Sequence, residues 1–309
     1  MLQAVLEEME RGDQVYLWGE GIGSKVAFDY PTLIRRFPTR IQTMPISEAC
    51  IVGAGLGAAL VGLRPVVDLS FDDLVPRAMD EILNDVAKVR FVTGGSSTSP
   101  IVVKIDLPPV RCAQTGQRLE SMFMHIPGLL VAIPSTPYDA KGLMKSSLRG
   151  DDPVIMVEDR WIEEKEAVPE DDYQIPFGKA IIRRDGEDAT ILTYGFMVKQ
   201  ALEIAAGLSR DGVEVEVVDL RTLSPLDVTS IFASVKKTGR VVIVEGGWRS
   251  CGVGSELSSI IVEECMGSLK KAPIRVAGKM THIPTSSALR MSVFPSNAEI
   301  KSAVKKVTA

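Results

Sequence analysis

Histidine and cysteine are both scarce in this sequence, and their positions argue against two common classes of site. The 309 residues include 2 histidines and 4 cysteines, and no two cysteines form a C-x-x-C pair. Neither histidine accompanies the cysteines at the spacing of metal ligands, so a zinc site and a disulfide framework are both disfavoured. We expect free, buried thiols instead, at Cys50, Cys112, Cys251 and Cys265.

Long apolar runs and an excess of one charge are also missing. No apolar run reaches the length of a membrane span. The first residues, MLQAVLEEMERGDQ, carry acids where a signal peptide needs a basic region, and they predict an amphipathic helix. The formal net charge is -5 with acids and bases intermixed, so we expect neither nucleic acid nor a membrane surface as a partner. Together these features predict a cytoplasmic protein.

Apolar strands and helical segments alternate along most of the chain. Runs such as PVVDLSF (65–71) are apolar on both faces, and segments of helical period such as 73–92 and 137–150 lie between them. This pattern is typical of a parallel sheet covered by helices on each side. An acidic, proline-containing stretch at 161–179 has neither period. We therefore predict an α/β protein of two domains, 1–160 and a smaller one at 180–309, joined by this linker.

A glycine-rich segment, MPISEACIVGAGLGAALVGL (44–63), has the G-x-G-x-x-A spacing of a dinucleotide-binding turn at Gly53, Gly55 and Ala58. Such a turn follows a strand and precedes a helix, whereas Ser47 followed by Glu48 indicates a helix that has already begun. The glycines then lie inside the helix, where a stripe of small residues allows another chain to approach closely. A dinucleotide-binding oxidoreductase stays open as the less favoured alternative.

Three longer segments resemble a known family. They are MPISEACIVGAGLGAALVGLRPVVDLSF (44–71), HIPGLLVAIPSTPYDAKGLMKSSLRGDDPVIMVE (125–158) and VEVEVVDLRTLSPLDVTSIFASVKKTGRVVIVE (213–245). The chain resembles, over nearly its whole length, the beta subunit of the thiamine-diphosphate-dependent, decarboxylating component of 2-oxoacid dehydrogenase complexes of the pyruvate, branched-chain and acetoin types. The resemblance implies a doubly wound pyrimidine-binding domain followed by a transketolase C-terminal domain. It also implies an alpha2-beta2 heterotetramer, in which the alpha subunit holds magnesium and the cofactor diphosphate through a G-D-G motif that this sequence lacks.

The same resemblance makes Glu48 the catalytic residue. A carboxyl group hydrogen-bonded to a ring nitrogen of the aminopyrimidine favours the tautomer that activates the cofactor. Ile46 would lower the polarity around Glu48, and Leu74 would cover the ring where the family has an aromatic residue. No metal ligand is expected from this chain. On composition alone Glu48 is an ordinary acid in the first turn of a helix, so a non-catalytic scaffold subunit remains an alternative.

The segment TGQRLE (115–120) departs from the family motif H-S-Q-S-x-E. Thr115 replaces a histidine that serves acyl transfer to a lipoyl arm, and a threonine hydroxyl does not shuttle protons near neutral pH. We expect Thr115, Gln117 and Arg118 in a substrate-entrance loop, where Arg118 or Arg111 meets a carboxylate or phosphate. The alternative for 110–118 is a polar, glycine-containing surface loop without a role in binding. The substrate is then a 2-oxo acid or a ketose. Thr115 puts a lipoyl-bearing acyltransferase partner in question, and the alternative is a subunit of a split transketolase-like enzyme that transfers a ketol or acyl group without one.

Overall fold

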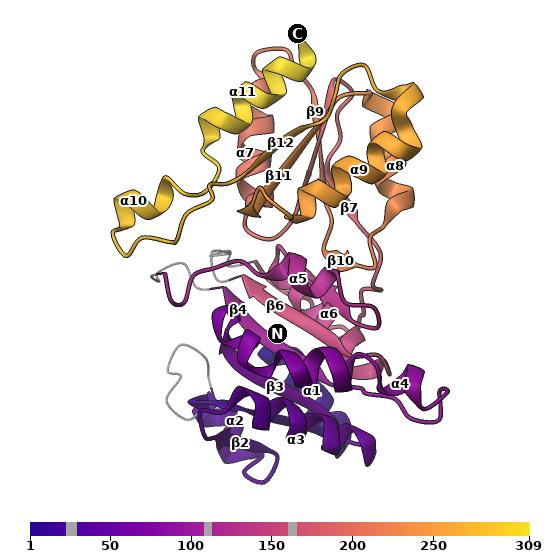
Figure 1. Cartoon of the computed structure of the whole chain (residues 1–309), viewed down its shortest axis with the longest axis vertical. Coiled ribbons are helices and arrows are strands. Elements are labelled where there is room, and N and C mark those ends of the chain that lie inside the picture. Colours follow the sequence, from indigo (N-terminus) through magenta and orange to yellow (C-terminus); the bar gives the residue numbers. More distant parts are fainter. Residues whose placement is uncertain (23–29, 108–112, 160–165) are drawn as a thin grey trace.

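Two β-sheets organise the described residues, which are 1–22, 30–107, 113–159 and 166–309 of this computed structural model (Figure 1). The strands of the first sheet are β1 (Val15–Glu20), β2 (Ile41–Met44), β3 (Arg64–Phe71), β4 (Val102–Leu107), β5 (Leu130–Ala132), β6 (Val154–Asp159) and β10 (Thr222–Ser224). They lie in the order β10-β5-β6-β4-β3-β1-β2, and every neighbouring pair is parallel except β10 with β5.

The second sheet is smaller and is also largely parallel. Its strands are β7 (Ile181–Arg184), β8 (Ala189–Thr193), β9 (Val215–Asp219), β11 (Val241–Trp248) and β12 (Ile274–Gly278). The order is β12-β11-β8-β9-β7, with only β7 and β9 antiparallel. The predicted two-domain α/β architecture with largely parallel sheets is therefore confirmed.

Helices flank both sheets (Figure 1). Those beside the first sheet are α1 (Leu2–Arg11), α2 (Tyr30–Arg36), α3 (Glu48–Leu60), α4 (Val89–Val92), α5 (Glu120–Met124) and α6 (Pro137–Arg149). Those of the second part are α7 (Met197–Ser209), α8 (Val228–Thr238), α9 (Val253–Cys265), α10 (Ser287–Met291) and α11 (Asn297–Thr308), with a 3-10 turn, η4 (Met266–Ser268), after α9. The sequence marks the bounds of α6 well, because the Thr136 hydroxyl accepts the N–H of Asp139 at 3.1 Å and Gly150 follows the last turn.

The segment 73–92, which has a helical period, is not one helix. It consists of a 3-10 helix, η2 (Asp72–Ala78), then a π-helical turn, η3 (Glu81–Val86), and then α4. Pro76 lies inside η2. Proline has no N–H to donate to the preceding turn, and its ring clashes with the carbonyl of an α-helix there, so the residue interrupts a regular helix. The result is an irregular segment that packs against α3.

Helix α3 holds the glycines of the apparent dinucleotide motif in its interior, as predicted. A Cβ on Gly55 would lie 2.7 Å from Ile101 Cδ1 and 2.8 Å from Val67 Cγ1, so this glycine lets the helix approach the first sheet closely. Gly57 lies on the exposed face of α3, and a Cβ there would meet nothing within 4 Å. Because the motif is helical, it lacks the strand-to-helix turn that a dinucleotide site requires.

Two features join the halves of the chain, and the sequence predicts neither. Strand β10 comes from the second half but pairs with β5 in the first sheet. One cluster of buried apolar side chains also continues from the first sheet into the second, and it includes Ile133, Leu192 and Leu223. The halves therefore share a core.

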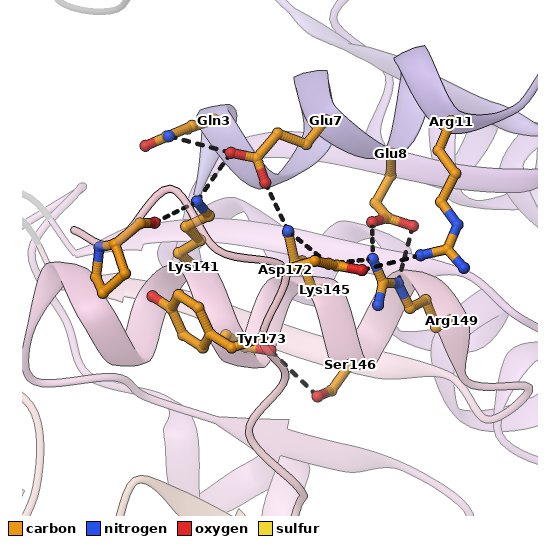
Figure 2. A network of polar contacts seen from close by, with 12 residues as sticks. Gln3, Glu7, Glu8, Arg11, Lys141, Lys145, Ser146, Arg149, Asp172 and Tyr173 are labelled. Atoms are coloured by element: carbon orange, nitrogen blue, oxygen red, sulfur yellow. Dashed lines mark hydrogen bonds and ion pairs between the residues drawn. The ribbon is translucent and has the colours of Figure 1, made fainter.

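The described part of the predicted linker, 166–179, packs on α6 and α1 through the polar network of Figure 2. Asp172 accepts from Lys145 Nζ at 2.8 Å, and the Pro169 carbonyl accepts from Lys141 Nζ at 2.7 Å. Glu7 of α1 contacts the same two lysines at 2.8 and 2.6 Å. Tyr173, which Figure 2 also labels, stacks its ring on that of Tyr138 with 4.4 Å between centroids. The segment is thus fixed to the first half, although it contains no helix or strand.

Candidate active site

Glu48 is the first residue of α3, and its side chain is only 2% exposed. Its Oε2 lies 3.1 Å from Nε of Arg77, a residue of η2 whose side chain is 73% exposed. Ser47 occupies the N-cap position, but its hydroxyl makes no capping hydrogen bond. The structure therefore presents one buried carboxylate at the start of a helix, paired with a cation that has ample room to move into solvent.

The two apolar residues predicted beside Glu48 differ in their surroundings. Leu74 is half-buried in η2, one turn before Arg77. Ile46 is 81% exposed, so the expectation that it shields Glu48 is wrong for this chain by itself. Ile46 precedes α3, outside the helical turn that buries Ile51 and Val52, and its side chain is left in solvent. Its role as a cofactor contact stays a prediction.

The predicted substrate loop lies beside the same irregular helix. Thr115 and Gln117 are half-buried, and the backbone N–H of Gln117 donates to Asp73 Oδ2 at 3.0 Å. Asp73 precedes Leu74 in η2. The loop that carries Thr115 and Gln117 is thus hydrogen-bonded to η2, the helix whose Arg77 contacts Glu48. Arg111 lies outside the described residues.

Arg118, the third predicted loop residue, has a different environment from the one expected. It is 5% exposed, and its guanidinium donates to Glu120 Oε1 at 3.2 Å and to Asp159 Oδ2 at 3.1 Å. Its guanidinium carbon also lies 5.0 Å from the centre of the Phe196 ring. Burial alone would lower the pKa of Arg118, but the Glu120 and Asp159 carboxylates outweigh it and raise the pKa above its ordinary value. The expectation that this guanidinium is free to bind a substrate anion is therefore wrong in this structure.

Asp159 extends the same contact into the second half of the chain, because its Oδ2 also accepts the backbone N–H of Phe196 at 3.1 Å. Arg118 and Asp159 are 41 positions apart. Arg118 thereby anchors the loop to the junction of the two halves. It thus fixes the end of the segment that carries Thr115 and Gln117.

A second acidic residue at this junction, Glu245, is one that sequence reasoning missed. It lies in β11, is fully buried, and faces the start of α9. Burial, together with the nearby Glu120 charge, raises the pKa of Glu245 to about 7, although the N–H groups of Gly254 and Val253 and the charge of Arg275 oppose the shift. The only signal in the sequence was an acid at the end of the apolar run RVVIVE, which is easily taken for a strand end.

An open groove of about 630 Å³ lies next to Glu245, between α5 and α9. Its lining includes Met122, His125, Cys251 and Glu256. Cys251 is exposed and has a φ of 54°, and Cys50 is exposed as well, whereas Cys265 is buried. The prediction of buried thiols is therefore wrong for Cys50, on the outer face of α3, and for Cys251, in the turn before α9, and it is confirmed for Cys265. Cys112 lies outside the described residues.

Family comparisons agree with this arrangement over nearly the whole chain. A model of the transketolase pyrimidine binding domain matches residues 1–162, and a model of the transketolase C-terminal domain matches residues 178–300. The beta subunit of acetoin:2,6-dichlorophenolindophenol oxidoreductase of Cupriavidus necator is 40% identical, over 98% of this chain and 94% of that protein. The chain belongs to the family of transketolase-like 2-oxoacid dehydrogenase beta subunits.

Two other members of the family have similar identity. The 2-oxoisovalerate dehydrogenase subunit beta of Bacillus subtilis is 38% identical over 91% of this chain and 90% of its own length. The pyruvate dehydrogenase E1 component subunit beta of Rickettsia felis is 39% identical over 98% and 95%. A solved structure titled as a split gene transketolase, inactive beta4 tetramer, superposes with a TM-score of 0.82 over 99% of this chain and 95% of that chain, at 21% identity. That last likeness concerns the fold alone.

The family depends on thiamine diphosphate, and the residues around Glu48 fit its aminopyrimidine ring. A ring of this kind needs a carboxyl group for one ring nitrogen and apolar contact for its faces. The buried Glu48 carboxylate can meet the first need, and half-buried Leu74, in the η2 helix that packs on α3, can meet the second. Among the described residues, every helix is too short or too polar to span a membrane, and no group of three or more His, Cys, Asp or Glu side chains is suited to a metal ion.

Proposed function

We propose that this chain is the beta subunit of an alpha2-beta2, thiamine-diphosphate-dependent 2-oxoacid dehydrogenase component, with Glu48 as the residue that activates the cofactor. The observation that carries the proposal is the buried Glu48 carboxylate at the start of α3, in a chain 36–40% identical to named dehydrogenase and acetoin oxidoreductase beta subunits. A split transketolase is a more distant relative, at 21% identity.

Glu48 would hold the aminopyrimidine ring by a hydrogen bond to a ring nitrogen and fix the tautomer of that ring. When bound, thiamine diphosphate supplies the carbon nucleophile that attacks the substrate carbonyl. Arg77 competes for the same carboxylate oxygen, and its 73% exposed side chain can turn into water when the ring arrives. The arginine regains water when it turns out, and the hydrogen bond to the ring replaces its contact with the buried carboxylate.

We propose that the outer face of α3 contacts the alpha subunit. That face exposes Gly53, Ala54, Gly57, Leu60 and Val61. Small residues allow a facing helix to approach closely, and the exposed leucine and valine favour burial against a partner. In this arrangement the alpha subunit supplies the ligands for magnesium and for the cofactor diphosphate. A cytoplasmic location remains a prediction.

The substrate and acceptor depend on the loop that carries Thr115. A 2-oxo acid fits the family relationship. Thr115 would influence which acceptor receives the acyl group, because a threonine has no group that titrates near neutral pH and so cannot transfer protons as a histidine does. Its side chain is half-buried, as is that of Gln117. Thr115 is the observation that favours the second candidate, a ketol- or acyl-transferring relative that needs no lipoyl partner.

The test is turnover by this chain co-expressed with a G-D-G-bearing alpha subunit, with magnesium and thiamine diphosphate. One panel offers 2-oxo acids with an artificial electron acceptor, a second offers ketose phosphates with an aldose acceptor, and acylation of a lipoyl-bearing domain is followed in parallel. Decarboxylation with lipoyl acylation supports the dehydrogenase. Decarboxylation without acylation, or ketol transfer, supports the second candidate, and inactivity on both panels by a correctly assembled complex contradicts both.

A further inference from the structure

A small, partly open chamber lies between the two halves of the chain, beside the α5–α9 groove. Its volume is about 30 Å³, and it shares Ser121, Gly252 and Val253 with the lining of that groove. The other lining residues are Arg118, Glu120, Tyr194, Glu245, Gly247, Trp248 and Ser250. A chamber of this volume exceeds the roughly 10–15 Å³ that one water molecule needs.

Three buried carboxylate oxygens at this chamber accept no hydrogen bond from a side chain. Glu120 Oε1 accepts from Arg118 Nε at 3.2 Å and from the Tyr194 hydroxyl at 3.1 Å, but Glu120 Oε2 accepts from no donor. Both oxygens of Glu245 also lack a side-chain donor, and only the backbone N–H groups of Val253 and Gly254, at the start of α9, face this carboxylate. A buried carboxylate oxygen without a full set of donors is unfavourable, so the convergence of these three oxygens favours an occupant between them.

The backbone around Glu245 is shaped to hold its carboxylate in this place. A Cβ on Gly252 would lie 2.6 Å from Glu245 Oε2, and a Cβ on Gly254 would lie 2.5 Å from Oε1. A Cβ on Gly247 would lie 3.5 Å from Glu120 Oε1 and 3.9 Å from Glu245 Oε2. The two carboxyl groups therefore converge on one small space from α5 and from β11, which belong to different halves of the chain.

Carboxylates outnumber cations among the described residues that line the chamber. Glu120 and Glu245 are two buried carboxylates, and Arg118 is the guanidinium in the same lining. Arg275 of β12 also acts on Glu245, but its guanidinium is hydrogen-bonded to Ser255 Oγ and to a backbone carbonyl. Uncompensated buried charge is strongly unfavourable, so these two carboxylates favour a further positive charge between them.

We propose that the chamber binds a small monovalent cation, potassium or ammonium, between Glu120 and Glu245. The ligands that the chamber offers are carboxylate and hydroxyl oxygens, which suit a hard cation. The cation would join α5, which follows the Thr115 loop, to β11 and the start of α9. Its occupancy would stabilise the junction of the two halves, and the open groove provides its route of entry.

The test is thermal unfolding of the full chain in chloride salts of potassium, ammonium or tetramethylammonium at constant ionic strength. Tetramethylammonium is too large for the chamber and serves as the reference. A ligand that binds only the folded state raises the melting temperature with its concentration. We expect potassium or ammonium to raise it by about 1–3 °C between 1 and 100 mM.

Glu245→Gln is the matched variant, because it keeps the side-chain shape and removes the charge. We expect this variant to fold and to lose the dependence on potassium and ammonium. Glu256→Gln, which removes an exposed acid from the same groove, should keep it. Thallium(I), a potassium mimic with strong anomalous scattering, should give a peak in the chamber of the parent protein.

Two results would overturn the proposal. Equal melting temperatures in all three salts would mean that a proton or a water molecule occupies the chamber. A cation dependence that persists in Glu245→Gln would mean that the cation binds elsewhere. The measurement requires neither cofactor nor partner chain, so its outcome is independent of the proposed enzymatic function.

Discussion

Two glycines of α3, two positions apart, are expected to respond to alanine in opposite ways. At Gly57 a methyl group would meet nothing within 4 Å, so alanine adds only its helix propensity and stabilises the chain by up to about 1 kcal/mol. At Gly55 the same propensity gain is opposed by contacts of 2.7 Å to Ile101 and 2.8 Å to Val67. Both neighbours are fully buried, and overpacking of a core typically costs about 1–3 kcal/mol.

The difference between the two variants isolates the packing effect, because the propensity gain is common to both. We therefore expect Gly55→Ala to be about 1–3 kcal/mol less stable than Gly57→Ala. Urea unfolding of the chain, followed by far-UV circular dichroism, measures this difference from the midpoints at equal slope. Equal midpoints for the two variants would refute the close approach of α3 to the first sheet.

Gly57 also tests the proposed contact with the alpha subunit. Gly57→Leu places a large side chain on the outer face of α3, where this chain has open space. The variant should fold as well as the parent but should fail to co-purify with the alpha subunit on size-exclusion chromatography. If the complex forms with undiminished yield, α3 is not the contact.

Four further outcomes follow from the site. Glu48→Gln in the assembled enzyme should lower kcat by about 10²–10⁴-fold, because it removes the proton-transferring group while keeping the side-chain shape. Thr115→His should raise the rate of lipoyl acylation about tenfold or more, with little change in decarboxylation by the artificial-acceptor assay. Arg118→Met leaves two buried carboxylates without their cation and should cost about 3–5 kcal/mol of unfolding free energy in urea titrations. The pKa of Glu245 is raised to about 7 in the folded chain, so protonation of this carboxyl group favours folding. In tetramethylammonium buffer this contribution, up to about 3 kcal/mol of unfolding free energy, should be complete below about pH 4.5 and should decline as the pH rises toward 7. Glu245→Gln should flatten this part of the pH profile.

Each of these outcomes has a clear contrary result. Full turnover by the Glu48 variant would favour a non-catalytic scaffold subunit. Unchanged acylation by the Thr115 variant would mean that this residue does not select the acceptor. An Arg118 variant as stable as the parent would argue that the ion pairs do not form in solution, and a pH profile that is identical with and without Glu245 would assign the titration to another group. Glu256→Gln, an exposed acid, is the control for both glutamate variants.

Much of the fold could be predicted because its signals are local. The alternation of apolar runs and helical periods predicted the α/β class, and the Thr136 cap with Gly150 marked the ends of α6. The helix that begins at Glu48 was predicted from its own first turn. These features depend on residues within about one or two turns of each other, so the chain order alone contains them.

The motifs of the chain were sufficient to indicate its family. They did not predict which side chains surround the site residues. Ile46 is exposed because it lies just outside the α3 turn that buries its neighbours, and a single apolar letter does not reveal this. Pro76 divides the segment 73–92, although the apolar period continues through it.

The tertiary structure alone decided the chemistry of the junction between the halves. Arg118 is buried because folding brings Asp159 and Phe196 to it from positions far along the chain. Glu120 and Glu245 converge because β11 ends beside α5. No period or cap encodes these contacts. The sequence by itself determined which elements form and which family they belong to, whereas the packing of the two halves determined which charged groups lose water, because desolvation depends on every neighbour in space.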